Sequence, residues 1–241
     1  MAVKVVHVCT VGVTALRLLL PQCRFLQRQG FDVSFVFSPG PDAELVRRQG
    51  FVVHEVYIDR QIKVIRDLKS IIDLEHCFRK IKPTIVHTHT SKAGVAGRLA
   101  AARARVPGII HTIHGFPFHP GMNPLKYLTY VQLERLAARY TTVLLSQSLE
   151  DVKTAQSLGI EPTSGKVVWI GNGVDVTRFD PRRFSREARR QIRKDLGVKD
   201  EEVIITTIGR VNREKGYEDL LSAAARLQGP WRLLCIGEDE G

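Results

Sequence analysis

The alternation of apolar strand-like runs with helix-like stretches constrains this 241-residue sequence more than any other feature. Many of the runs are continuous and rich in β-branched residues, as in VIITTI at 203–208, and do not alternate between apolar and polar positions. Such runs are typical of strands in a parallel sheet that helices cover on both faces. The sequence therefore predicts an α/β fold built on a doubly wound parallel sheet.

The expected elements follow one another along the whole sequence. We predict strands at residues 3–8, 33–37, 52–57, 84–88, 109–113, 142–145, 166–170, 203–208 and 232–236. We predict helices at residues 13–29, 43–49, 64–80, 93–105, 124–139, 148–158, 185–196 and 217–227.

The strand and helix rhythm is interrupted at residues 171–185, where GNGVDVTRFDPRRFS is rich in glycine, aspartate and arginine. Ser185 is a residue type that often caps a helix start, and the rhythm resumes after it. We therefore predict a complete Rossmann-like domain over residues 1–172 and a second domain over residues 173–241. Two strands and two helices do not complete a doubly wound sheet, so we expect the second domain to be incomplete and the chain to be truncated at its C-terminal side.

Hydropathy and cysteine spacing exclude several classes of protein. No apolar stretch reaches the roughly 18 residues that span a bilayer, and the N-terminus is typical of a strand rather than of a signal peptide. We therefore expect a cytoplasmic location. The four cysteines show no paired C-x-x-C spacing, which predicts reduced thiols and neither disulfides nor structural zinc; they are Cys9, Cys23, Cys77 and Cys235.

The formal net charge of +11 needs an explanation. Eight basic and two acidic residues lie between Arg178 and Lys194. Neither interleaved aromatic residues nor a nucleic-acid-binding motif accompanies them, so no nucleic acid partner is expected. A peripheral contact with an anionic membrane surface and a solvated face without any partner are both compatible with this charge.

Histidines gather at the ends of two predicted strands. Ligand sites in open α/β sheets lie at the carboxyl ends of strands, and five histidines fall there or just beyond: His87, His89, His111, His114 and His119. His114 is followed by a glycine and a turn, so it is the histidine best placed to project into a cleft. Backbone hydrogen bonds are the alternative role for a strand-end histidine such as His87 or His111.

His87 and His89 are two residues apart on one predicted strand, so their side chains point to the same side. An H-x-H pair can bind a metal ion, and a metal-dependent hydrolase is an alternative to consider. The carboxylates that accompany such sites are missing, and Lys92 would place a cation beside the metal. We therefore predict no metal at these histidines.

Two other residues near predicted strand ends are candidates for substrate binding. Lys92 opens the helix expected at 93–105, where a cation opposes the helix dipole and so indicates an anionic partner; an ordinary surface lysine is the alternative. Gly12 lies in the first predicted turn and permits close backbone approach. That turn lacks the G-x-G-x-x-G pattern, so we do not expect NAD or FAD.

The segment VIITTIGRVNREKG at 203–216 predicts an anion site. A strand ends at Gly209, Arg210 follows, and Lys215 precedes the helix expected at 217–227. Unpaired N–H groups at a helix start and two cations suit a diphosphate, such as that of a nucleotide. A solvated turn is the alternative. No D-x-D motif is present to hold a divalent ion, so side chains would neutralise the diphosphate and no metal cofactor is expected.

Several of these segments together resemble one family. IGNGVDVTRFDP, TIGRVNREKGYEDLLSAAARL and LLCIGEDEG resemble, in this order, the domain junction and nucleotide-binding domain of retaining family 4 glycosyltransferases. HTHTSKAGVAGRLAA and IIHTIHGFPFH resemble the subgroup that builds bacterial capsule, exopolysaccharide and O-antigen units. The resemblance implies a GT-B fold, with two Rossmann-like domains that face each other across a cleft.

The resemblance also implies roles for individual residues. Arg210 and Lys215 would hold the donor diphosphate, next to Gly209, and His114 would contact the donor sugar near the reacting carbon. Gly12 matches the glycine of the first loop, although the usual double glycine is absent. Asn172 belongs to the N-G-V-D junction, which is better suited to shaping a hinge than to catalysis.

The implied reaction transfers a sugar from a nucleoside diphosphate sugar to an acceptor hydroxyl, with retention and without metal. The acceptor would be lipid-linked or a saccharide, at the inner face of the plasma membrane. The family's pair of glutamates that contacts the donor would fall beyond residue 241, so we expect these residues alone to be inactive. A two-Rossmann enzyme like UDP-N-acetylglucosamine 2-epimerase and a non-catalytic nucleotide-binding protein are the alternatives.

Overall fold

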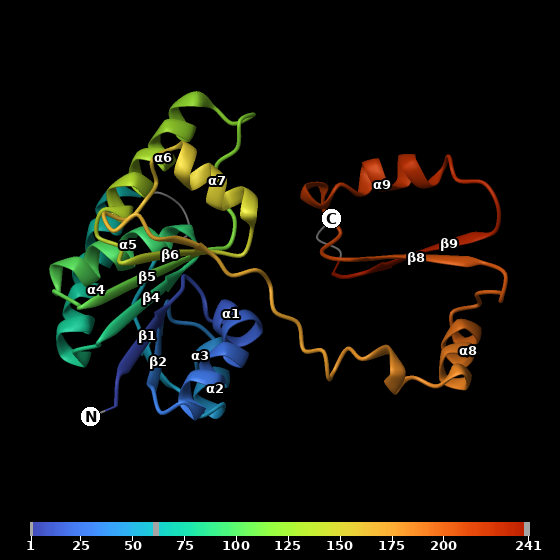
Figure 1. Ribbon diagram of the computed structural model, residues 1–241, viewed down its shortest axis with the longest axis horizontal. Coiled ribbons are helices and arrows are strands. Elements are labelled where there is room, and N and C mark those ends of the chain that lie inside the picture. Colours follow the sequence, from blue (N-terminus) through green and yellow to red (C-terminus); the bar gives the residue numbers. More distant parts are fainter. Residues whose placement is uncertain (1, 60–62, 239–241) are drawn as a thin grey trace. The chain divides into compact units, whose positions relative to one another are not determined.

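The computed structural model describes residues 2–59 and 63–238 and divides the chain into two compact units, Met1–Gly173 and Val174–Gly241 (Figure 1). The sequence had placed the division between residues 172 and 173. Each unit has its own sheet, and the two are described separately below.

Unit 1 is built on a seven-stranded sheet in which every strand pair is parallel. The strand order β3-β2-β1-β4-β5-β6-β7 turns back between β1 and β4. In open α/β sheets, ligands bind at the carboxyl ends of the strands that flank this reversal. The strands are β1 (Lys4–Val8), β2 (Asp32–Phe37), β3 (Val52–Glu55), β4 (Ile85–His89), β5 (Gly108–Ile113), β6 (Val143–Ser146) and β7 (Val167–Trp169).

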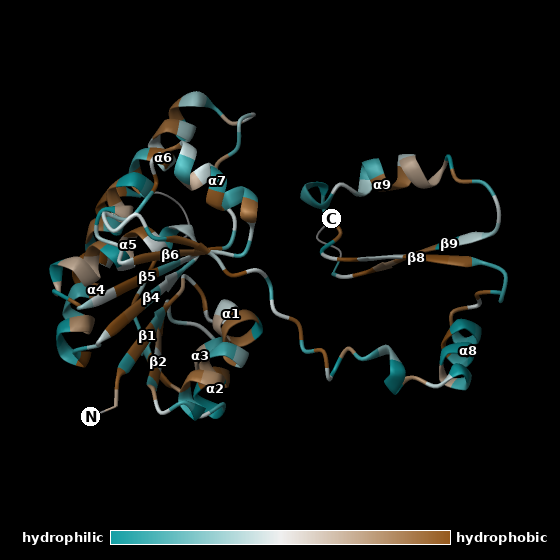
Figure 2. Cartoon of the chain, viewed as in Figure 1, coloured by the Kyte–Doolittle hydropathy of each residue, from teal (hydrophilic) through white to brown (hydrophobic). Residues whose placement is uncertain are grey.

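Helices cover both faces of this sheet, as the continuous apolar strands predict. Figure 1 shows the first three helices on one side of the sheet and the next three on the other, and Figure 2 shows apolar strands between them. Val6, Val8 and Val86 are fully buried in this interior. The helices are α1 (Gly12–Thr14), α2 (Leu20–Arg28), α3 (Asp42–Arg48), α4 (Val64–Ile81), α5 (Ser91–Arg103), α6 (Pro124–Ala138) and α7 (Leu149–Ser157).

The doubly wound fold and its predicted strands are confirmed, and the helix predicted at 13–29 needs one correction. The segment Ala15–Leu19 between α1 and α2 is a π-helical turn. Pro21 lies in the first turn of α2. A proline lacks the N–H for an i→i−4 hydrogen bond, and its ring pushes against the carbonyl one turn before it. The wider π turn directly before Pro21 accommodates this proline within an otherwise continuous helix.

Helix α5 lies close to the sheet because two of its residues have no side chain. A Cβ atom at Gly94 would be 2.5 Å from Cε1 of His111, and one at Gly97 would be 2.7 Å from Cγ2 of Thr88. Such distances are shorter than van der Waals contact. These glycines therefore let α5 settle against β4 and β5 and bury its alanines.

Unit 2 contains a two-stranded parallel sheet of β8 (Val203–Ile208) and β9 (Trp231–Ile236). Two helices accompany it, α8 (Arg186–Asp195) and α9 (Tyr217–Ala224), together with the short 3₁₀ helices η2 (Pro181–Arg183) and η3 (Arg213–Lys215). The predicted cap is confirmed, because the Ser185 hydroxyl accepts a hydrogen bond from the N–H of Ala188 at 3.1 Å. Within the described part of the chain, no helix has both the length and the apolar composition to cross a membrane.

Candidate functional site

The loops that follow β1 and β4 meet at the reversal point of the sheet. The hydroxyl oxygens of Thr10 and Thr90 are 2.9 Å apart and join the two loops. Gly12 is the first residue of α1, and a Cβ there would be 2.5 Å from the Cβ of Asp42. Gly12 thus lets α1 pack against α3, and this contact keeps the first loop close to the sheet.

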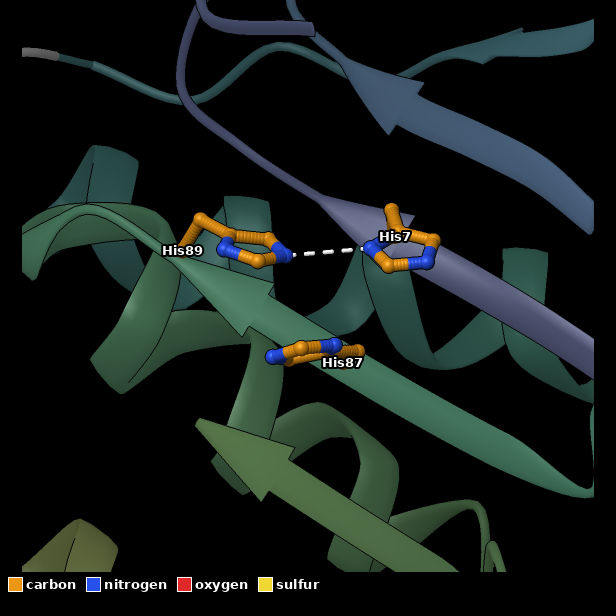
Figure 3. Close-up of side chains that lie close together, drawn as sticks. All are labelled: His7, His87 and His89. Carbon is orange, nitrogen blue, oxygen red and sulfur yellow. Dashed lines mark hydrogen bonds between the residues drawn. The ribbon is translucent and has the colours of Figure 1, made fainter. Parts of the chain in front are cut away.

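A row of histidines lies at this edge of unit 1. Figure 3 shows the rings of His7, His87 and His89 close together, from β1 and β4. Nδ1 of His7 is 3.0 Å from Nε2 of His89, and Nδ1 of His89 is 3.1 Å from Nε2 of His114. Nδ1 of His114 is 2.8 Å from Oε1 of Gln147. The structure therefore links four side chains, from β1 to the loop after β6, in one hydrogen-bonded row.

The direction of these hydrogen bonds follows from the end at Gln147. With the amide oxygen of Gln147 facing the ring, Nδ1 of His114 must donate, because an amide oxygen only accepts. A neutral His114 then accepts at Nε2 from Nδ1 of His89, and His89 accepts at Nε2 from Nδ1 of His7. Each ring carries its proton on Nδ1. The row ends at Nε2 of His7, which is buried and has no hydrogen-bond partner among the described residues.

Burial keeps the rings of His7, His87 and His89 neutral. It lowers the pKa of His7 to about 4, because a charged imidazole would lose its hydration there. Burial also holds the pKa of His87 and that of His89 well below the ordinary value, and neighbouring histidines add to the effect. A ring that donates from one nitrogen and accepts at the other must be neutral, because a charged imidazole has only donors.

The other histidines of the predicted group have different partners. The side chain of His111 lies on the other face of the sheet from His87 and His89. The pKa of His111 is lowered mainly by burial and then by the charge of Arg98. Nδ1 of His111 is 3.1 Å from the carbonyl oxygen of Thr88, so the predicted backbone hydrogen bond is confirmed. Nε2 of His87 lies 2.7 Å from the hydroxyl of Thr112. The ring of His87 thus lies on the same sheet face as those of His7 and His89, and the ring of His111 lies on the other face.

His7, His87 and His89 could together offer nitrogen ligands to a metal ion, since one nitrogen from each lies within 4.8 Å of the others. The rings of His87 and His89 lie 4.2 Å apart at an angle of 36°, so they run side by side rather than converge on one point. The group contains three neutral ligands and no carboxylate to offset a buried dication. Its geometry fits the hydrogen-bonded row better than a metal site.

Lys92, the second residue of α5, has an acidic neighbour within the chain. Its Nζ is 2.5 Å from Oδ1 of Asp67 on α4, and the two side chains are 20% and 24% exposed. The carboxylate of Asp67 is thus an anionic partner for the cation at this helix start. The position of Lys92, three residues after His89, places it at the same sheet edge as the histidine row.

The predicted anion site in unit 2 is a loop between β8 and α9. Gly209 and Arg210 follow β8, and Lys215 ends η3. Nη2 of Arg210 is 3.7 Å from a carboxylate oxygen of Glu214, and half of the Arg210 side chain is exposed. Within residues 2–59 and 63–238, no side chain caps the start of α9. Two cations and an uncapped helix start are compatible with a bound anion, and the exposure of Arg210 is equally compatible with a solvated turn.

A close backbone contact fixes the start of this loop. A Cβ at Gly237 would be 1.8 Å from the carbonyl oxygen of Gly209, so only glycine permits the approach. The same carbonyl accepts a hydrogen bond from the hydroxyl of Tyr217 at 3.2 Å. The chain that follows β9 and the first residue of α9 thereby hold Gly209 in place.

The predicted site residues are divided between the two units. Unit 1 contains Gly12, Lys92 and His114, as well as Asn172, which is exposed in an irregular segment. Unit 2 contains the loop with Gly209, Arg210 and Lys215.

Sequence reasoning missed two members of the histidine row, His7 and Gln147. The parallel pairing of β1 with β4 aligns His7 with His87, and no local sequence pattern predicts this pairing. It also missed the buried ion pair between Arg98 and Glu134, whose Nη2 and Oε2 atoms are 2.5 Å apart.

A doubly wound unit followed by a second α/β unit defines the GT-B class of folds. The structure of Anabaena HepE in complex with UDP and glucose is similar, with a TM-score of 0.74 and 16% identity. The match covers 98% of this chain and 61% of HepE. The model of Glycosyltransferase Family 4 matches residues 17–178, and the chain belongs to this family.

Two of the curated relatives are bacterial glycosyltransferases. The chain is 33% identical over 201 residues to the UDP-Gal:alpha-D-GlcNAc-diphosphoundecaprenol alpha-1,3-galactosyltransferase of Escherichia coli, covering 83% of the chain and 51% of the relative. It is 27% identical over 228 residues to the capsular polysaccharide biosynthesis glycosyltransferase CapM of Staphylococcus aureus, covering 91% and 56%. The chain thus spans about half the length of these two relatives.

Proposed function

We propose that this chain is part of a glycosyltransferase that moves a sugar from a nucleoside diphosphate sugar to an acceptor hydroxyl in cell-surface polysaccharide synthesis. Membership of Glycosyltransferase Family 4 carries the proposal. The Escherichia coli relative is named for a UDP-sugar donor and a diphosphoundecaprenol-linked acceptor. By analogy, the acceptor of this chain is a lipid-linked saccharide at the inner face of the plasma membrane.

The loop of Gly209, Arg210 and Lys215 is the proposed site of the donor diphosphate. Negative charge grows on the diphosphate as the bond to the sugar breaks. Cations that are in place before the reaction stabilise this charge, and removal of one such group typically costs about 10²–10³ in rate. The acceptor proton then moves to a diphosphate oxygen on the same face of the sugar, which gives retention without a metal or a carboxylate base.

His114 is proposed to act through a fixed orientation. Its two ring nitrogens already bond to His89 and Gln147. A ring held from both ends keeps the segment after β5 rigid, so that this segment can present a constant surface to the donor sugar. Direct contact of the ring with a sugar hydroxyl would require His114 to exchange one of these partners.

The experiment that tests the donor site is UDP binding to the 241-residue chain by calorimetry, with Arg210→Ala and Lys215→Ala as variants. We expect each variant to weaken binding about tenfold, because a charge-assisted hydrogen bond is lost. Arg226→Ala removes an exposed cation elsewhere in unit 2 and is the matched control. Equal binding by all three variants would contradict the proposal.

Sugar transfer is tested with the protein, supplied with a UDP-sugar and a lipid-linked saccharide. We expect a retained anomeric configuration, read by NMR of the product. We expect residues 1–241 alone to transfer no sugar, because they span only about half the length of the curated relatives. Epimerised nucleotide sugar in the absence of acceptor would instead favour an epimerase.

Membrane association is tested by flotation with vesicles. Basic residues dominate between Arg178 and Lys194, and apolar residues such as Phe184 and Ile192 are exposed among them. We expect the chain to float with vesicles that contain anionic lipid at low salt and to remain behind with neutral vesicles. Equal recovery with both vesicle types would remove the electrostatic contact.

A further inference from the structure

An apolar slot lies between α4, α5 and α6 in unit 1. The cavity has a volume of about 330 Å³, within the range of small-molecule sites. Val95 and Leu99, four residues apart on one face of α5, line it from one side. Apolar side chains from the two flanking helices line the rest, including Leu68 and Ile71 of α4 and Leu133 of α6.

The outer rim of the slot is also apolar. At the start of α4, Val64, Ile65 and Leu68 are 70%, 84% and 57% exposed. In the turn of α6 that precedes the slot-lining Thr129, Leu125 and Leu128 are 74% and 51% exposed. Single exposed apolar residues are common, but neighbouring ones beside a hollow mark a surface that binds an apolar partner.

One end of the slot is polar and lies at the carboxyl edge of the sheet, where the histidine row also lies. Ser91 and Lys92 line the slot and begin α5, directly after the carboxyl end of β4. Lys92 faces Asp67, which lines the slot from α4. At the wall formed by α6, the buried carboxylate of Glu134 is neutralised by Arg98. The slot therefore combines an apolar body with a charged mouth at the proposed reaction edge.

We propose that this slot binds the isoprenoid chain of an isoprenyl diphosphate acceptor, with the diphosphate beside Lys92. The inference rests on the proposed function, since it names the site of the lipid part of the acceptor. An amphiphile fits because its charged head and apolar tail match the two ends of the slot. An extended peptide fits poorly, because its backbone N–H and C=O groups would find few partners on the apolar lining.

Because Lys92 already pairs with Asp67, the proposal predicts opposite effects on binding for substitutions of these two residues. The carboxylate of Asp67 competes with a diphosphate for Lys92 and repels it. Asp67→Asn should therefore strengthen binding of an isoprenyl diphosphate a few fold, whereas Lys92→Met should weaken it. Binding of farnesol, which has the same chain and no charge, should respond much less to either change.

The body of the slot is tested with farnesyl diphosphate and the 241-residue chain in a calorimetric titration. Leu99→Trp fills the slot and should weaken binding about tenfold or more, because isoprenoid carbons lose buried contacts. Leu68→Ser makes the wall polar without adding volume, so it tests the same point if the tryptophan disturbs folding. Leu45→Trp adds the same side chain at an exposed site on α3 and should change binding less than about twofold.

Two further probes locate the effect. Inorganic diphosphate should bind equally to Leu99→Trp and to the unchanged chain, since it has no apolar part. A benzophenone-bearing prenyl diphosphate should crosslink to peptides from α4, α5 and α6, as identified by mass spectrometry. Crosslinks confined to other helices would overturn the proposal, as would equal farnesyl diphosphate binding by the unchanged chain and Leu99→Trp.

The outcome is separable from that of the proposed function. Binding of the prenyl chain requires no sugar transfer, so slot-dependent binding without transfer would refute the proposed reaction alone. Transfer to a lipid-linked acceptor that Leu99→Trp leaves unchanged would refute the slot alone. A dimer that Leu99→Trp dissociates, seen by analytical ultracentrifugation, would make the slot a contact between copies and also overturn the proposal.

Discussion

The two units follow the same strand and helix rhythm but bury it to different degrees. In unit 1, Val6 and Val8 of β1 are completely buried between helices. In unit 2, Val203 and Ile208 at the ends of β8 are 62% and 79% exposed. The comparison teaches that apolar periodicity determines which elements form, whereas burial depends on how many layers and neighbouring strands surround them.

The difference extends to polar side chains. Among the described residues, every buried polar or charged side chain lies in unit 1, including His7, His89 and Arg98. The cations of the β8–α9 loop are exposed in the described structure of unit 2. The candidate site in unit 1 is thus fixed by hydrogen bonds, and the anion loop in unit 2 is mainly held through its backbone. The following predictions, from the largest effect to the smallest, challenge this contrast.

Replacing a buried cation should have the largest effect. Arg98→Met leaves the carboxylate of Glu134 buried without its partner, which typically costs about 3–5 kcal/mol of unfolding free energy. Arg232→Met removes the more exposed partner of Glu202 in unit 2 and should cost less than about 1 kcal/mol. Urea unfolding followed by circular dichroism measures both values. Similar losses for the two variants would break the contrast between the units.

Acid should destabilise unit 1 through its histidines, because all eight histidines lie at or before residue 119. The pKa of His7 is about 4 in the folded chain and about 6.5 when unfolded, so its contribution is complete above pH 6.5. It is lost as the pH falls towards 4, because only the unfolded chain takes up the proton. The loss is on the order of 3 kcal/mol.

The measurement is the free energy of unfolding between pH 7 and pH 4, for the unchanged chain and for His7→Phe. The phenylalanine keeps an aromatic ring beside Phe35 but cannot take up a proton. We expect a shallower pH dependence for the variant, although it also loses a hydrogen bond to His89. Identical slopes would show that His7 is not held neutral by folding.

Close packing of α5 should make its glycines sensitive to a single methyl group. Gly94→Ala would bring Cβ to 2.5 Å from the ring of His111, and the required shifts should cost about 1–3 kcal/mol. Gly173→Ala, at the end of unit 1, meets no atom within 4 Å and is the control. Thermal unfolding should separate the two variants. Equal melting temperatures would mean that α5 lies less tightly on the sheet.

Thiol reactivity should show the smallest effect, on rate rather than on stability. Burial raises the pKa of Cys9 and of Cys23 to about 12, and that of Cys77 to about 11. Cys235 in unit 2 is exposed. Iodoacetamide should therefore label Cys235 first, and the two most deeply buried cysteines only in denaturant, as followed by mass spectrometry. Early labelling of Cys9 would show local opening of unit 1.

Sequence patterns predicted most of the fold because the signals are local. Continuous β-branched runs identified the strands, and Ser185 marked the start of α8. The π turn before Pro21 was missed, because a proline after a good helical pattern also permits an ordinary helix start. The exposure of β8 was missed as well, since a strand's sequence does not state how many neighbours cover it.

The candidate site was predictable only in part. His87, His89 and His114 stood out because they cluster in sequence near strand ends. His7 joins them through the parallel pairing of β1 with β4, which brings together residues about eighty positions apart. The pairing of Lys92 with Asp67 is also between distant positions, across α4 and α5. Such contacts depend on strand order and helix packing, which local patterns do not encode.

The hydrogen bonds of the histidine row, which ends at the unpartnered Nε2 of His7, can reverse direction only together. If the amide of Gln147 turned over, His114 would have to accept at Nδ1, and the protons of all three rings would move to Nε2. The reversed row would bury an unsatisfied N–H at His7, which costs more than the unsatisfied acceptor present now. One amide at the loop after β6 therefore sets the polarity of a row that ends in the centre of the sheet.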